Sequence, residues 1–213
     1  FNREGRYPQP GAWQAHDSRY GKWFHFTGEK YDSWWGIKTL PAVDKNNADY
    51  RAFIAAVARR WMAQGVAGWR LDVADELPDD FLRGFYETVK QEKNNALILG
   101  EVWEDASNKI AYSVRRKYFT ERELDGVMNY PLRDAILGFV GGRITAEQAR
   151  EVMEMLCTHY PKPILHCLMN HIGTHDTPRA LTMLVRPDIA QLPRAEQAHV
   201  ALSEDERAHA KAL

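Results

Sequence analysis

The sequence predicts an α/β fold with a parallel sheet, arranged as part of a (β/α)8 TIM barrel. Short apolar runs of strand length alternate with segments of helical period, which is typical of parallel sheets. The runs also end in polar groups, namely Asp72, Glu101, Asn129 and the pair His175 and Asp176. A barrel brings the C-terminal ends of its strands to one mouth, whereas a doubly wound sheet does so only beside its switch point. The repeated polar strand ends therefore favour the barrel.

Residues 1–48 are expected to form a long irregular segment. Glycine and proline recur throughout it. It also holds four of the seven tryptophans, which are Trp13, Trp23, Trp34 and Trp35. Loops of this length are uncommon in compact domains unless they are functional. Two roles remain open for these tryptophans: packing in a core and stacking on sugar rings.

Residues 49–213 alternate between helix and strand patterns. Apolar residues recur at helical spacing over 49–64, and Gly65 follows as a helix terminator. Thr145 and Gln148 form the signature of a capping box before another helix. Further helices are predicted over 80–93, over 110–119, from 132, over 178–185 and within 193–213. Strands are predicted over 66–73, 96–102, 126–130 and 164–172.

Composition excludes several classes of partner. The formal net charge is −1, with 28 basic and 29 acidic side chains, so we expect no nucleic-acid partner. No apolar run approaches the roughly 18 residues of a membrane span, so we expect no membrane partner. Cys157 and Cys167 cannot build a disulfide framework, and we expect them to be buried free thiols. So few cysteines favour a reducing, cytoplasmic compartment.

The carboxylates at the strand ends are the candidate catalytic groups. Arg70 and Asp72 are two residues apart on a strand and therefore face the same side. A charged Arg keeps a neighbouring carboxylate ionised, as a nucleophile requires, although the pair also fits a structural role. Glu101 ends an apolar run beside Trp103, which would supply an apolar wall or a sugar platform. Apolar surroundings raise the pKa of a carboxyl group, which suits a general acid.

His175 and Asp176 follow the fourth predicted strand. His175 can donate hydrogen bonds to sugar hydroxyls and Asp176 can stabilise a developing cation, but the pair also fits a helix N-cap. A metal site at His171 and His175 is disfavoured, because neither a two-histidine helical spacing nor a cysteine pair supports it. We therefore expect no metal site and no cofactor.

Together these residues resemble the ordered short motifs of the α-amylase family of glycoside hydrolases. The matches are Gly68, Arg70 and Asp72 to Gly-x-Arg-x-Asp, Gly100, Glu101 and Trp103 to Gly-Glu-x-Trp, and His175 and Asp176 to a His-Asp pair. The resemblance implies that Asp72 is the nucleophile, Glu101 the general acid and base, and Asp176 the transition-state stabiliser. The substrate-binding residues that it implies are Arg70, Glu76, Trp103 and His175.

Residues near the first motif also resemble one subgroup, the neopullulanases and cyclomaltodextrinases. Glu76 matches the subgroup, whereas Asp75 stands where the subgroup tends to carry Asn. The implied activity is retaining hydrolysis of α-1,4 bonds in maltodextrins, cyclodextrins, pullulan or starch, with α-1,6 bonds left open. A transglycosylase or isomerising relative with the same carboxylates and a non-catalytic carbohydrate-binding relative remain alternatives. A structural calcium ion in the parent protein is not readable from these residues.

The resemblance places the chain at strands 4 to 7 of the barrel. Residues 1–48 would then be the loop before strand 4, and residues 49–213 an incomplete barrel. Both ends look truncated, and the family's Asp-x-x-x-Asn-His motif of strand 3 is not found. A partial barrel exposes sheet edges and apolar surface. We therefore expect the fragment to associate with itself through those edges and to have little activity alone.

Overall fold

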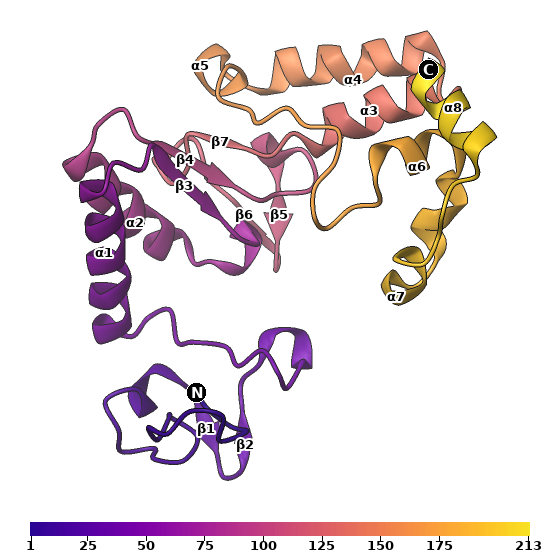
Figure 1. The fold of residues 1–213 in the computed structure, drawn as a ribbon. Helices are drawn as coiled ribbons and strands as arrows, with labels where there is room; N and C mark the ends of the chain where they lie inside the picture. The colour runs from indigo at the N-terminus through magenta and orange to yellow at the C-terminus, as the bar shows by residue number, and fades with distance from the viewer. The chain divides into compact units, whose positions relative to one another are not determined.

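In a computed structural model, which describes all residues from 1 to 213, the chain forms two compact units. Unit 1 comprises residues 1–67 and 77–96, and unit 2 comprises residues 68–76 and 97–213. Figure 1 labels the helices and strands of both units. All the candidate site residues belong to unit 2.

The first part of unit 1, residues 1–47, has little regular structure, as predicted. Its elements are two 3-10 helices, η1 (Gly21–Trp23) and η2 (Trp34–Gly36), and two short antiparallel strands, β1 (Phe26–Thr27) and β2 (Lys30–Tyr31). The ring of Trp13 packs beside that of Phe1, with 5.9 Å between the ring centroids. Packing therefore accounts for Trp13, whereas Trp35 stacks on Trp34 and remains largely exposed.

Two helices complete unit 1, α1 (Ala48–Ala63) and α2 (Asp79–Glu92). Each lies within one residue of its predicted bounds. The side chain of Asn47 caps the N-terminus of α1. The two helices pack against each other, and Arg51 of α1 forms an ion pair of 2.7 Å with Asp80 of α2. Asp80 lies in the first turn of α2, where a negative charge also complements the helix dipole.

The parallel sheet lies in unit 2. It consists of β3 (Gly68–Leu71), β4 (Leu97–Gly100) and β7 (Gly126–Val127), in the order β3-β4-β7. Gly68 pairs with Leu97, and a Cβ atom at Gly68 would overlap the carbonyl oxygen of Leu97. Met169 extends the sheet beyond β7 by a single parallel bridge to Met128. The predicted α/β class with a parallel sheet is therefore confirmed.

One predicted helix, over residues 110–119, was wrong. The chain there forms a hairpin of two short strands, β5 (Ile110–Ala111) and β6 (Val114–Arg115). The β-branched side chains of Ile110 and Val114 favour extended backbone over helix, which the weak helical period concealed. The two residues between the strands, Tyr112 and Ser113, both have positive φ and make the turn.

One predicted strand, over residues 164–172, was also wrong. Residues Lys162–Leu165 form a short helix, α5, with a proline in its first turn, where the fixed φ of proline suits a helix. Only Met169 makes a strand-like contact. A short apolar run fits a strand and a buried helical turn equally well, so periodicity could not separate them.

The remaining elements of unit 2 are helical. They are η3 (Ala74–Glu76), η4 (Ala106–Asn108), α3 (Tyr130–Val140), α4 (Ala146–His159), α6 (Ala180–Val185), η5 (Pro187–Gln191), α7 (Arg194–Gln197) and α8 (Glu204–Ala212). The predicted capping box of Thr145 and Gln148 starts α4. None of the helices is long and apolar enough to cross a bilayer.

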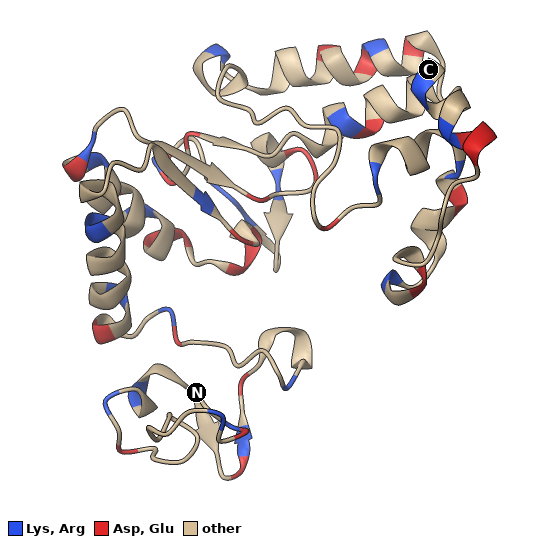
Figure 2. Ribbon diagram, in the orientation of Figure 1, with Lys and Arg blue, Asp and Glu red and all other residues tan.

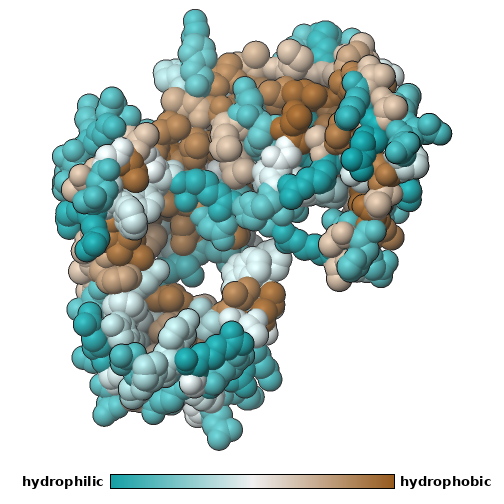
Figure 3. All heavy atoms as spheres, viewed as in Figure 1, coloured by the Kyte–Doolittle hydropathy of each residue, from teal (hydrophilic) through white to brown (hydrophobic).

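Helices α3 and α4 lie side by side and carry an exposed apolar groove. Its lining includes Phe139, Ala149, Met153 and Cys157, and Figure 3 shows hydrophobic residues in the region of these helices. Cys157 is exposed and Cys167 is half-buried, so the predicted burial of both thiols was wrong. Both cysteines are free thiols.

Candidate active site

Arg70 of β3 connects the two acids that follow β3 and β4. Its guanidinium donates a hydrogen bond to Asp72, and its Nη2 lies 3.0 Å from Oε2 of Glu101. Leu71 pairs with Gly100 in register, so Asp72 and Glu101 leave the sheet at the same edge. Figure 2 shows a basic position on β3 and acidic positions where the chain leaves that strand. The prediction that Arg70 and Asp72 face the same side is confirmed.

Glu101 is held on both carboxylate oxygens. Its Oε1 accepts a hydrogen bond of 3.2 Å from the indole N–H of Trp103. Its Oε2 accepts one of 2.9 Å from the backbone N–H of Val73, beside the Arg70 contact. The residue is only 4% exposed. Two hydrogen bonds and the ion pair with Arg70 therefore fix the direction in which this carboxyl group points.

Asp72 has the opposite surroundings, because 73% of its side chain is exposed. Arg70 orients it from one side and leaves most of the carboxylate open to a ligand. The next residue, Val73, has a φ of 42°, which a β-branched residue adopts at a cost of about 1–3 kcal/mol. This conformation is the one in which the Val73 N–H donates to Glu101. The strained backbone of Val73, next to Asp72, thus helps to orient Glu101.

The carboxylate of Asp176 lies between the side chains of His175 and Arg194. Nε2 of His175 is 3.0 Å from one carboxylate oxygen, and Nη2 of Arg194 is 2.9 Å from the other. The backbone N–H of Asp176 donates to the hydroxyl of Thr174. His175 itself is largely exposed, with 75% of its side chain accessible. The N-cap alternative for this pair is not observed, because α6 begins at Ala180 with Arg179 as its cap.

Tyr130 is a residue of this region that sequence reasoning missed. It is buried, its ring stacks on Trp103 with 4.4 Å between centroids, and its hydroxyl faces Thr174. Burial raises the pKa of the Tyr130 hydroxyl, and the nearby carboxylates of Glu101 and Asp176 raise it further. Tyr130 therefore lies near Glu101 and Asp176. Its place immediately after a strand-end asparagine was the available signal.

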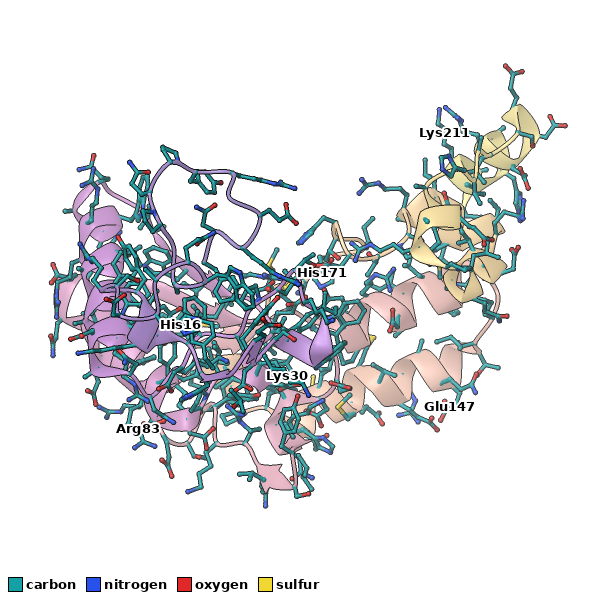
Figure 4. All side chains as sticks on the ribbon, turned by 90° about the horizontal axis from the view of Figure 1, so that it is seen from below. His16, Lys30, Arg83, Glu147, His171 and Lys211 are labelled. Atoms are coloured by element: carbon teal, nitrogen blue, oxygen red, sulfur yellow. The ribbon has the colours of Figure 1, made fainter.

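His171 packs edge-on against Tyr130, with 4.7 Å between ring centroids. Figure 4 labels it in the segment near the start of α3, away from the labelled Glu147 of α4. Burial lowers the pKa of His171, and the positive charge of Arg133 lowers it further. His171 is therefore a neutral ring supporting Tyr130 near neutral pH.

Polar residues at the other strand ends have distinct roles. Asn129, after β7, caps α3 with its side-chain oxygen and donates from its amide to Asn170 at 2.9 Å. Glu76, in η3, accepts a hydrogen bond from the hydroxyl of Tyr112 in the hairpin. The structure therefore groups Arg70, Asp72, Glu101 and Trp103 directly, and Glu76 contacts the hairpin.

Comparison with known proteins identifies the family. The sequence matches the family model described as "Alpha amylase, catalytic domain" over residues 2–204. The chain belongs to the alpha-amylase family. A cyclomaltodextrinase from Geobacillus thermopakistaniensis is 34% identical in an alignment of 177 residues, which covers 78% of this chain and 28% of that protein. Neopullulanase 2 from Thermoactinomyces vulgaris is 35% identical over 147 residues, which are 68% of this chain and 24% of that protein.

Solved structures of the alpha-amylase family agree. Cyclic alpha-maltosyl-(1→6)-maltose hydrolase from Arthrobacter globiformis, in complex with maltose, has a TM-score of 0.72 and 29% identity. The match covers 84% of this chain and 40% of that structure. The resemblance to the neopullulanase and cyclomaltodextrinase subgroup is confirmed by these relatives. The chain spans about a quarter of the two curated relatives, at 28% and 24% of their lengths.

Proposed function

We propose that the full-length protein carrying this chain is a retaining glycoside hydrolase acting on α-glucosidic bonds. The substrates proposed are maltodextrins, cyclodextrins, pullulan or starch, which accords with relatives named cyclomaltodextrinase and neopullulanase. The observation that carries the proposal is the Arg70 bridge between an exposed Asp72 and a buried Glu101. Retaining hydrolysis requires two such carboxyl groups, one to attack the sugar and one to transfer protons.

The different surroundings of the acids assign their roles. Asp72, exposed and paired with Arg70, attacks the anomeric carbon and forms a covalent glycosyl-enzyme. Glu101, buried and held by two hydrogen bonds and an ion pair with Arg70, protonates the leaving glycosidic oxygen and then takes a proton from the attacking water. Asp176 stabilises the positive charge that develops on the sugar ring between these states.

The remaining residues bind and orient the substrate. Arg70 holds the Asp72 carboxylate in place by a hydrogen bond. His175 and Glu76 offer hydrogen bonds to sugar hydroxyls, and Trp103 offers a partly exposed ring beside Glu101. None of these proposed steps requires a cofactor.

The same proposal assigns the sheet to the barrel. Strands β3, β4 and β7 and the Met169 segment would be barrel strands 4 to 7, with residues 1–48 as the loop before strand 4. The parallel order β3-β4-β7 followed by the Met169 bridge supports this assignment.

The test of the proposed activity is the stereochemistry of the first product. The full-length protein is incubated with maltotriose and the anomers are followed by NMR before mutarotation. A retaining α-glucosidic hydrolase releases the α-anomer first, whereas release of the β-anomer or the absence of turnover would reject the proposal. In parallel, Glu101→Gln should still release fluoride from α-glucosyl fluoride in the first turnover, because that leaving group needs little protonation, and should lose cleavage of maltotriose.

A further inference from the structure

The hairpin after Glu101 is fastened to the segment after Asp72 through one residue, Asp75. Three side chains that flank β5 and β6 converge on it. They are Lys109, whose Nζ is 3.3 Å from Oδ2, Tyr118, whose hydroxyl is 2.5 Å from Oδ1, and Arg116, whose Nη1 donates to the Asp75 carbonyl at 3.0 Å. Both ends of the hairpin are therefore anchored beside η3, which contains Asp75 and Glu76.

These anchoring contacts are shielded from water. Tyr118 is 1% exposed, Arg116 is also buried, and 16% of the Lys109 side chain is accessible. Burial alone would lower the pKa of Lys109, but its contacts with Glu104 and Asp75 outweigh burial and raise it. A shielded ion pair restrains its partners more firmly than a surface pair, because screening by solvent is weaker.

The anchor explains why this position carries a charge. Asp75 stands where the subgroup tends to have Asn, and here a carboxylate faces the ammonium of Lys109. An asparagine amide would keep one acceptor oxygen but would present an N–H₂ group to Lys109 or Tyr118 without neutralising the buried charge. The presence of Asp75 in place of the subgroup's Asn therefore matches its contacts with the residues that flank the hairpin.

The tip of the hairpin is strained and presents an aromatic ring. Tyr112 and Ser113 have φ values of 52° and 63°, a turn in which Gly or Asn is the usual choice. Tyr112 is 69% exposed, yet its hydroxyl donates a hydrogen bond to Glu76. A tyrosine kept at a strained and exposed turn position, tied by its hydroxyl to a candidate substrate-binding residue, points to a role in binding.

We propose that Tyr112 is a sugar-binding platform and that Asp75 positions it. The exposed face of the Tyr112 ring would stack on the C–H face of a glucose unit, while the Glu76 carboxylate accepts hydrogen bonds from its hydroxyls. This unit would lie beyond the sugar ring that reacts with Asp72, because Tyr112 is hydrogen-bonded to Glu76 in η3, past Asp72 in the chain. The inference rests on the proposed glucanase function and names one binding position within it.

The first experiment measures oligosaccharide binding in the full-length protein. Calorimetry with maltoheptaose on a Glu101→Gln background separates binding from cleavage. Tyr112→Ala is expected to raise Kd about tenfold, since stacking of this kind is worth about that factor, and Tyr112→Phe to raise it less. Val114→Ala, an exposed change in the same hairpin, is the matched control and should leave Kd within about twofold.

The second measurement, of steady-state kinetics, distinguishes a failure of the Tyr112 platform from a failure of the proposed hydrolase activity. With Glu101 intact, Tyr112→Ala should raise KM for maltotriose and leave turnover of α-glucosyl fluoride unchanged, because the fluoride has no sugar unit beyond the reacting ring. Equal binding by Tyr112→Ala and the control would overturn the platform. A wild-type protein that turns over neither substrate would instead reject the proposed function.

The third measurement tests Asp75 as the positioning residue. Asp75→Asn should raise Kd for maltoheptaose in the same direction as Tyr112→Ala, with kcat for α-glucosyl fluoride unchanged. It should also speed tryptic cleavage after Arg115 and Lys117, since the hairpin is released from its anchor. Cleavage and Kd that both match the wild type would overturn the positioning role, and an Asp75→Glu variant should restore part of both.

Discussion

The backbone N–H of Val73 donates a hydrogen bond of 2.9 Å to Oε2 of Glu101, across two neighbouring strands. The donor directly follows one proposed catalytic acid, and the acceptor is the other. The positive φ of Val73 aims the N–H at the carboxylate. The two acids are therefore coupled through backbone as well as through Arg70.

Substitution of Val73 tests that coupling. Val73→Gly keeps the N–H and relieves the left-handed strain, so kcat for maltotriose should stay within a few-fold of the wild type. Val73→Pro removes the N–H and fixes φ near −65°, so kcat should fall by roughly 100-fold or more. Circular dichroism on both variants shows whether the fold is kept, and equal kcat values in folded proteins would contradict the coupling.

Replacement of Arg70 tests the bridge between the acids. Arg70→Lys keeps a positive charge but cannot contact Asp72 and Glu101 from one planar group, so a fall in kcat of roughly 100-fold is expected. Arg70→Met also removes the charge and should lower kcat further. The measurement is single-turnover kinetics with maltotriose, and Arg59→Lys, an exposed arginine on α1, serves as the control.

The protonation of His171 should make stability depend on pH. Its pKa in the folded chain lies below the ordinary value of 6.5, because burial and Arg133 disfavour the charged ring. The unfolded chain therefore binds more protons as pH falls below about 6.5, and the free energy of unfolding decreases until the pH lies below the folded pKa. Urea titrations give the free energies of unfolding of the wild type and of His171→Asn, which has no titrating ring at this position. As pH falls from 7.5 to 5.5, the wild type should lose stability relative to the variant, so that the two free energies converge. Parallel curves would contradict the assignment.

The isolated polypeptide of residues 1–213 should associate with itself. Strand β3 is an edge of the three-stranded sheet, and the groove of α3 and α4 exposes apolar side chains. Light scattering at dilute concentration should therefore report a dimer or a larger species, and maltodextrin turnover should be low. A monomer that turns over maltodextrin at an ordinary enzymatic rate would contradict this prediction.

Much of the fold could be predicted because local patterns agree with tertiary structure. The helices α1, α2 and α4 carry clear periods, side chains cap α1 and α4, and the short strands β3 and β4 are each followed by an acid. The hairpin could not be predicted, because its turn residues, Tyr112 and Ser113, are not typical of positive φ. The residues that flank it also contact Asp75, which is distant in sequence.

The candidate site was predictable in its residues but not in their contacts. The pairing of Arg70 with Asp72 follows from strand alternation. The Val73 hydrogen bond depends on a strained φ, and the position of Tyr130 near Glu101 and Asp176 depends on how three separate segments pack. The strained φ leaves no pattern in the sequence, and the only sequence signal for Tyr130 is its place after the strand-end Asn129.

The measurement that tests the account most directly is identification of the covalent glycosyl-enzyme. The full-length Glu101→Gln variant is incubated with maltosyl fluoride, because the fluoride leaves without acid assistance while the lost base slows release by water. Peptide mass spectrometry should then find the sugar attached to Asp72, and Asp72→Ala should abolish the adduct. An adduct on another residue, or turnover by an intact enzyme that releases the inverted anomer, would contradict the account.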